Sequence, residues 1–227
     1  MEFTPYTRIS IQVSLSGYSF KVEKDGESHS SGWLGSERIF TTPEFQRRYD
    51  KVDIALMTPK FTLVPAPFFD PSNAREALSE VVSLREEDRV ESVPLPEYGA
   101  VLVYSNSLDE SLSKVISQTV LMTDGTSAPV LPEMYYILRD LPQCPDYNKI
   151  LASYRDGYLH LAVSQGKSLQ LCNAYESVDF TTAEYFIFLV MKKLQLNPEV
   201  SGIVFRTPLT QEMEMSLYRY FKAVEVI

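Results

Sequence analysis

The chain has 227 residues and carries 21 basic against 30 acidic side chains, which gives a net charge of −9 at pH 7. Apolar residues make up 44% and charged residues 22%, the balance of a folded chain, which excludes intrinsic disorder. The acidic charge argues against a nucleic acid or an anionic membrane as partner, because both attract clustered lysine and arginine.

The first part of the chain predicts three strands, a helix and a fourth strand. Runs rich in β-branched and aromatic residues predict a hairpin broken at Gly17. Thr41 and Glu44 fit a capping box, which predicts a helix start with Pro43 in its first turn. The predicted strands cover residues 8–15, 18–22, 36–40 and 52–57.

The middle of the chain predicts a smaller α/β region. Its predicted strands cover residues 61–64, 90–95, 99–104 and 120–122, and its helices cover residues 71–83, 108–117 and 132–141. The proline-rich stretch 141–145 is the expected lobe boundary. We therefore expect a first lobe over residues 1–145, with an inserted subdomain at about 60–105, and a second lobe over residues 146–227.

The last part of the chain predicts the same order of elements as the first. Its strands are predicted at residues 150–154, 158–163, 168–175, 202–205 and 223–227, and its helices at residues 181–196 and 210–221. Asp156-Gly157 is a strong signal for a tight turn, because both residues tolerate positive φ. Thr181 and Glu184 fit a second capping box. The run from Tyr185 to Met191 is apolar on every side, which predicts a buried helix.

An internal repeat supports a duplication. The sequence FTTPEF at residues 40–45 matches FTTAEY at residues 180–185, an offset of 140 residues. The same offset aligns further pairs, namely Gly17-Tyr18 with Gly157-Tyr158, Gly26 with Gly166, and Ser28 with Ser168. A constant offset over matching predicted elements favours two tandem copies of one unit.

A three-strand meander, a helix, and then alternating strands and helices, all repeated in tandem, resemble the actin-like ATPase superfamily. The resemblance implies an α/β, two-lobed actin-like ATPase fold with tandem ribonuclease-H-like units, mixed sheets and an inserted small α/β subdomain. Residues 100–141 look like the cytoplasmic actin-like proteins of type IV pilus and type II secretion systems. The chain also resembles an uncharacterised Bacteroidetes family of unknown function, in the segments SIQVSLSGYSF (10–20), FTLVPAPFF (61–69) and LQLCNAYESVDFTTAEYFIFLVMKKLQLNP (169–198).

Nucleotide-binding members of this superfamily carry an Asp two residues before the glycine of the first hairpin turn, where it helps to place metal and attacking water. The matching position here is Leu15, and in the second copy it is Arg155. The candidate residues of these two cleft turns are Ser14, Ser16, Gly17, Asp156 and Gly157. Asp156 directly adjoins Gly157 and is more simply the turn residue.

Those relatives also present a Gly-Gly-type turn to the adenosine after a late strand. Here that place holds Phe205-Arg206-Thr207-Pro208, so Arg206 joins the candidate cleft residues. Because phosphoryl transfer depends on positioning the metal and the phosphate charge, we expect that nucleotide chemistry has been lost, with no cofactor, metal or catalytic residue. The expected function is a non-catalytic interaction or scaffold protein, a pseudo-enzyme whose two turns line a cleft for an unidentified protein partner.

Other functions stay open. An ATP-binding phosphotransferase or ATPase could use displaced acids, such as Asp124 or Asp179. Nucleic-acid processing by a ribonuclease-H-like site would need clustered carboxylates and a basic track, which the charge balance disfavours. A homodimer also stays open.

The cysteines and histidines form no metal-binding pattern. Cys144 and Cys172 are expected to be free thiols of a reducing compartment. A Cys–His nucleophile pair stays open, since such partners meet in space, but the sequence around Cys144 does not resemble a nucleophile turn. His160 is expected on one face of a strand. Trp33 is either an exposed recognition residue or packed on its own lobe. With no secretory signal and no apolar run of about 20 residues, we expect a cytoplasmic protein without membrane insertion.

Overall fold

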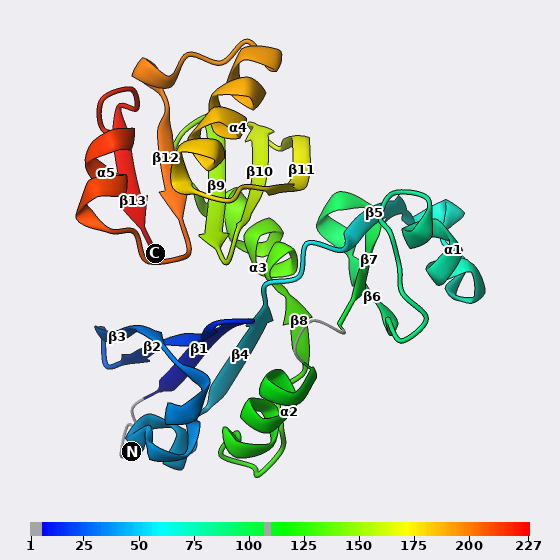
Figure 1. Cartoon of the computed structure of the whole chain (residues 1–227), viewed down its shortest axis with the longest axis vertical. Coiled ribbons are helices and arrows are strands. Elements are labelled where there is room, and N and C mark those ends of the chain that lie inside the picture. The colour runs from blue at the N-terminus through cyan, green and yellow to red at the C-terminus, as the bar shows by residue number, and fades with distance from the viewer. Residues whose placement is uncertain (1–5, 107–109) are drawn as a thin grey trace. The chain divides into compact units, whose positions relative to one another are not determined.

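The computed structural model describes residues 6–106 and 110–227, which form two compact units (Figure 1). The first unit takes in the described residues of 1–58, 70–92 and 103–132, and the second takes in residues 59–69, 93–102 and 133–227. The predicted lobe boundary after residue 145 and the subdomain at about 60–105 stay predictions. Within the described ranges, no helix has the length and apolarity that a bilayer crossing requires.

The first unit is built on a five-stranded sheet. Its strands are β1 (Thr7–Ser14), β2 (Gly17–Lys24), β3 (Glu27–Leu34), β4 (Lys51–Leu56) and β8 (Val130–Pro132), in the order β3-β2-β1-β4-β8. The three hairpin strands are antiparallel, and β4 is parallel to both β1 and β8. Alternate β1 residues Ile9, Ile11 and Val13 are buried in a core that includes Ile116 of α2 (Glu110–Thr119).

The segment after β3 corrects two predictions. The third strand is β3, not residues 36–40, and residues 36–46 form two 3-10 helices, η1 (Ser36–Thr41) and η2 (Pro43–Gln46), in place of the predicted α-helix. Pro43 has no backbone N–H to donate, and it disfavours helical geometry at Thr42, whose ψ of 113° is extended. Thr41 and Glu44 therefore form no capping box.

The second unit contains a sheet of the same design. Its strands are β9 (Asn148–Arg155), β10 (Tyr158–Gln165), β11 (Ser168–Glu176), β12 (Gly202–Phe205) and β13 (Ala223–Val226), in the order β11-β10-β9-β12-β13. Strands β9, β10 and β11 are antiparallel, and β12 is parallel to β9 and β13. The two sheets therefore share strand order and strand direction, as the predicted tandem fold requires.

Both faces of the second sheet are covered. On one face, Leu159, Leu161 and Val163 of β10 pack in a core with α4 (Phe180–Lys193) and α5 (Gln211–Leu217), and Figure 1 shows α4 alongside β9–β11. His160 points to the other face, where it is fully buried and stacks on Phe61 with ring centroids 6.2 Å apart. The helix α3 (Glu133–Asp140) packs against β9 and β10 on that face.

The helix α4 departs from its prediction in two ways. Its N-cap is Asp179, whose carboxylate accepts a 2.7 Å hydrogen bond from the backbone N–H of Thr182, so Thr181 and Glu184 form no capping box. Its apolar run is also not buried on every side, because Tyr185 is 61% exposed. The expected helix ends at 196 and 221 were too long, since α4 ends at Lys193 and α5 at Leu217.

The remaining elements are short. β5 (Phe61–Pro65), β7 (Ala100–Ser105) and β6 (Val90–Leu95) form a three-stranded sheet in that order, and α1 (Ala74–Ser79) is shorter than predicted. The strand predicted at residues 120–122 is replaced by isolated bridges, and the first two positions of the helix predicted at 108–117 lie outside the described residues. Further 3-10 helices are η3 (Ala66–Phe68), η4 (Pro71–Asn73), η5 (Pro96–Tyr98), η6 (Leu141–Gln143) and η7 (Pro198–Val200).

Candidate functional site

The first candidate turn joins β1 to β2. Ser14 is buried and lies opposite Gly17 in the hairpin, whereas Leu15 at the tip is 61% exposed. Gly17 has a φ of +139°, and a Cβ at this position would lie 2.0 Å from the carbonyl oxygen of Leu34. Only glycine fits this close approach of two backbone segments. The tip itself presents an apolar side chain where nucleotide-binding relatives place an acid.

The other residue at this tip is engaged by the end of β3. The indole Nε1 of Trp33 donates a 3.0 Å hydrogen bond to the hydroxyl oxygen of Ser16. Trp33 is half-buried, and its indole holds the hairpin turn of its own unit. The structure therefore favours packing over free exposure for Trp33.

The second candidate turn joins β9 to β10. Asp156 and Gly157 have φ values of +48° and +78°, so both central residues adopt the positive φ that a type I′ turn requires. The Nε atom of Arg155 lies 3.4 Å from a carboxylate oxygen of Asp156. Partial burial lowers the pKa of Arg155 from its ordinary value, and the charge of Asp156 opposes that shift. Asp156 is thus a turn residue paired with a neighbouring cation.

Arg206 follows β12 and lies in a cluster of charged side chains within the second unit. Its Nε donates to Oε1 of Glu133 at 2.9 Å, and another guanidinium nitrogen pairs with Asp140. The side chains of Arg206, Glu133 and Asp140 are 10%, 0% and 16% exposed. At this burial each charge requires a partner, so the two carboxylates compensate the guanidinium.

The helix α3 supplies both acids of this cluster. Glu133 and Asp140 are seven positions apart, close to two helical turns, so both reach the same side of α3. The hydroxyl of Ser153 on β9 donates to Glu133 at 2.6 Å. The guanidinium of Arg206 also lies 5.5 Å from the ring centroid of Tyr136, within the range of a cation–π contact. Arg206 is therefore fixed by α3 on several sides.

The acids proposed for a displaced catalytic site serve as local caps. The Asp124 carboxylate accepts hydrogen bonds from the N–H and hydroxyl of Thr126, at 2.8 and 2.6 Å. Asp179 accepts the corresponding pair from Thr182 at the start of α4. These hydrogen bonds lower the pKa of both carboxyl groups from the ordinary value. Both groups are ionised structural acceptors at neutral pH.

The cysteines have the properties of unreactive thiols. Both are free, and burial raises the pKa of Cys144 to about 11 and that of Cys172 to about 12. A nucleophilic cysteine needs a lowered pKa, which neither has. His160 is enclosed against Phe61 on the buried face of the second sheet, and His29 lies on the edge strand β3.

The candidate residues do not fit a magnesium nucleotide. Magnesium is held in such sites through carboxylate oxygens, but the first tip offers Leu15 and the second offers Arg155 beside an already paired Asp156. Arg206 has its charge compensated by α3. Among the side chains that the structure describes, no three from histidine, cysteine, aspartate or glutamate come together as a metal site needs.

The structure brings the predicted residues together in two groups. Ser14, Ser16 and Gly17 share one turn of the first unit, and the rest belong to the second unit. The sequence reasoning missed Glu133, Asp140 and Ser153, which make the most buried charged cluster around a candidate residue. Two acids seven positions apart on a predicted helix were the available signal for this cluster, but no local pattern linked them to Arg206.

Two solved structures are similar to nearly the whole chain. One is a protein with actin-like ATPase fold and unknown function from Bacteroides thetaiotaomicron, with a TM-score of 0.67, 17% identity, and coverage of 100% of this chain and 93% of the other. The second is the PilM–PilN type IV pilus biogenesis complex, with a TM-score of 0.53, 13% identity, and coverage of 97% and 88%. None of the curated proteins matches the chain. Identities this low show a shared fold alone.

The family comparison covers almost the full sequence. Residues 4–224 match the family described as Protein of unknown function (DUF3822). The predicted resemblance to a family of unknown function with an actin-like ATPase fold is confirmed, together with the α/β fold class. The chain therefore belongs to the DUF3822 family, and its two ribonuclease-H-like sheets form the actin-like ATPase fold.

Proposed function

We propose that this protein is a non-catalytic interaction or scaffold protein, in which the actin-like fold has lost nucleotide chemistry. The observation that carries the proposal is the cluster of Arg206, Glu133 and Asp140. It occupies the place where the superfamily resemblance expects a glycine turn that approaches the adenosine. A long side chain anchored by two carboxylates there fills space that a bare backbone would leave to a ligand.

The two hairpin turns support the same proposal. A metal-dependent phosphoryl transfer needs acids that hold magnesium and orient water. Leu15 offers no donor, and Arg155 brings a positive charge that would repel the metal. The hydroxyl of Ser16 is already bonded to Trp33. Ser16 and the Arg155–Asp156 pair are thus engaged in contacts within the protein itself.

A protein partner is the most suitable ligand class for such a molecule. The related PilM fold is described in a complex with PilN, which indicates that this architecture can carry a protein-binding role. The net charge of −9 disfavours nucleic acid. For this chain a protein partner is proposed because the fold is similar to that of PilM and because the negative charge disfavours nucleic acid.

Three further features belong to the proposal. A cytoplasmic location is supported by the two free thiols, which suit a reducing compartment. An origin in Bacteroidetes is supported by the similar protein from Bacteroides thetaiotaomicron. An internal duplication is supported by the two sheets of equal strand order and by the FTT repeats at 40–42 and 180–182.

Titration calorimetry with ATP and magnesium tests the proposal. We expect no heat of binding and no nucleotide-dependent rise in melting temperature for the full chain, because a ligand that does not bind cannot stabilise the folded state. The matched variant Arg206→Met should give the same null result. Tight binding of ATP by the natural chain would overturn the proposal, and weaker binding by Arg206→Met would then make Arg206 a nucleotide ligand.

A further inference from the structure

The outer face of α4 is unusually apolar for a surface helix. An exposed helix normally presents charged residues to solvent. Here Phe188 and Leu189 follow Tyr185 by three and four residues, so both lie beside it on one face. Tyr185 is 61% exposed, and Phe188 and Leu189 are half-buried. Tyr185 is thus open to solvent, whereas Phe188 packs in part against the core of the second unit.

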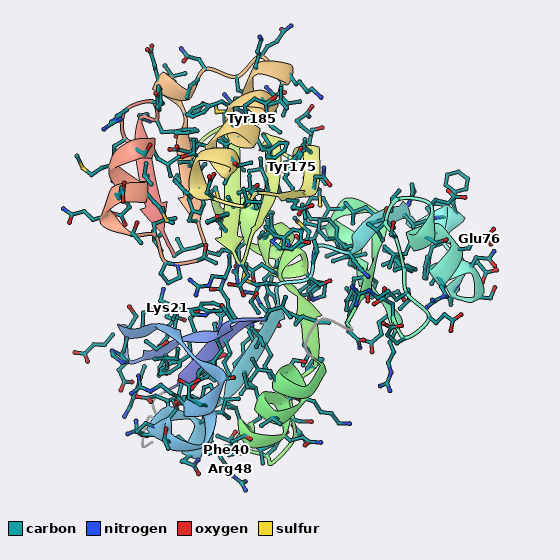
Figure 2. The ribbon with its side chains drawn as sticks, viewed as in Figure 1. Lys21, Phe40, Arg48, Glu76, Tyr175 and Tyr185 are labelled. Atoms are coloured by element: carbon teal, nitrogen blue, oxygen red, sulfur yellow. The ribbon has the colours of Figure 1, made fainter. Side chains whose placement is uncertain are left out.

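Aromatic side chains extend this face on both flanks. On one flank Phe186 stacks on Tyr175 of β11, with ring centroids 4.6 Å apart, and contacts Tyr185, with centroids 5.4 Å apart. Figure 2 labels Tyr175 and Tyr185. On the other flank Phe188 contacts Tyr220, which follows α5 and is 50% exposed, at 4.9 Å. We call the set Tyr175, Tyr185, Phe186, Phe188, Leu189 and Tyr220 the α4 patch. These rings are ordered against one another before any partner arrives.

A contiguous aromatic patch of this kind marks an interaction surface. Single exposed apolar residues are ordinary, but grouped ones on a monomer are rare and mostly functional. Tyrosine and phenylalanine are enriched at the centres of protein interfaces, because large rigid rings bury much area at little entropic cost. The α4 patch therefore fits a protein surface of matching apolar character.

The charges at the two ends of α4 indicate which protein surface would bind the α4 patch. Three acids lie around the N-terminal end: the exposed Glu176 at the end of β11, the cap Asp179, which accepts from Thr182, and Glu184, one oxygen of which is buried. The C-terminal end carries Lys192 and Lys193, both exposed. The patch thus lies between an acidic end and a basic end. A second α4 placed antiparallel would match acids to lysines at both ends.

We propose that the α4 patch is a twofold interface with a second copy of this chain, in which two α4 helices pack antiparallel. Such an interface is isologous, so the acid-to-lysine match occurs twice. Antiparallel packing also sets the two helix dipoles in opposite directions, and it places the lysines beside the partner's acids. The aromatic rings then bury one another at the centre. The proposal goes beyond the loss of nucleotide chemistry and does not depend on it.

Sedimentation velocity of the full chain over a concentration series tests the interface. We expect a dimer that dissociates on dilution, and we expect Tyr185→Glu to weaken the dimer about tenfold or more, because it places a charge at the patch centre. The matched control is Tyr147→Glu, which alters a tyrosine of the same unit that is 71% exposed and outside the patch. The control should leave the dimer unchanged, and circular dichroism should show both variants folded.

Charge variants test the antiparallel arrangement. One variant carries Lys192→Glu with Lys193→Glu, and the other carries Glu176→Lys with Glu184→Lys. Each alone should be monomeric, because like charges then meet at both ends. Mixing the two should restore a heterodimer, because each end again pairs acid with base. Lys24→Glu with Lys51→Glu, in the first unit, controls for the change in net charge.

Three results would overturn the proposal. They are a chain that stays monomeric at high concentration, a dimer that survives Tyr185→Glu, and charge variants that fail to pair on mixing. Capture of a different protein by the α4 patch of a monomeric chain would likewise replace the second copy as occupant. Nucleotide binding is measured separately, so a dimer that binds ATP would refute the proposed function and leave this interface standing.

Discussion

The six-residue motif shared by the two units folds in two different ways. In the second unit, residues 180–185 begin the α-helix α4, and the N–H of Ala183 donates to the carbonyl of Asp179 at 3.1 Å. In the first unit, residues 40–45 fall in two 3-10 helices, since Pro43 stands where Ala183 donates. The N-cap Asp179 also has no counterpart, because the aligned residue is the buried Ile39.

The last residue of the motif is buried in the first unit and exposed in the second. Phe45 is 1% exposed and packs on Tyr18 and Phe20, with ring centroids 5.1 and 5.7 Å apart. The aligned Tyr185 is 61% exposed at the centre of the α4 patch. The proline and the missing cap together separate an aromatic ring used for the core from one available for an interface.

A second contrast follows the fourth strand of each sheet. The N–H of Met57 donates to the carbonyl of Val13, and the N–H of Arg206 donates to the carbonyl of Ala152, both at 2.9 Å. The backbone positions are equivalent, and each is followed by Thr-Pro. Met57 is buried and apolar, whereas Arg206 pairs with the acids of α3. Equivalent backbone positions thus carry a packed apolar side chain in the first unit and a member of an ion cluster in the second.

The largest expected effect comes from truncating the two aligned aromatic rings. Phe45→Ala should lower the free energy of unfolding by about 3–5 kcal/mol, because it empties a packed core site. Tyr185→Ala should change it by less than about 0.5 kcal/mol, because the ring is exposed. Chemical denaturation of both variants measures the difference. Equal losses of unfolding free energy in the two variants would contradict the assignment of one ring to the core and the other to the surface.

The next effect concerns the residue after the fourth strand. Arg206→Met introduces the residue of the first unit and leaves Glu133 buried without its cation, so we expect a loss of about 3 kcal/mol. Adding Glu133→Gln and Asp140→Asn should restore part of that loss. A neutral single variant would contradict the assignment of Arg206 to a structural ion cluster.

A smaller effect is expected from placing the proline of the first motif into the second. Ala183→Pro removes the hydrogen bond to Asp179 and crowds a fully buried site, with an expected loss of about 2–3 kcal/mol. Circular dichroism should also report less helix. The reverse change, Pro43→Ala, should create no helix, because Ile39 cannot cap one. A gain of helix in Pro43→Ala would mean that the proline alone causes the difference.

The smallest effect is the pH dependence of the α4 cap. Hydrogen bonds from Thr182 hold the pKa of Asp179 below its ordinary value, so its stabilising contribution is complete above the unfolded-state pKa of about 3.9. That contribution is lost as the pH falls through the lower pKa of the folded state. Asp179→Ala should therefore be less stable than the natural chain at pH 7 and approach it in acid. A constant difference in acid denaturation would exclude the cap as the cause.

The sequence predicted local structure well where one turn or one strand decides it. The hairpins at Gly17 and Asp156-Gly157 and the order of most strands follow from glycine positions and β-branched runs, which act over a few residues. It failed where a neighbouring residue competes for the same role, and where a distant group decides the outcome. The capping boxes were displaced by Asp179 and by the extended geometry before Pro43. The burial of Arg206 depends on α3, more than 60 residues earlier, which no local pattern reveals.

Phosphate release from ATP by the purified full chain, with magnesium, tests the central claim most directly. We predict a rate equal to that of buffer, unchanged in Asp124→Asn and Asp179→Asn, because both carboxylates cap their own loops. Steady release by the natural chain that is abolished by either substitution would contradict the claim and establish an ATPase with a displaced acid.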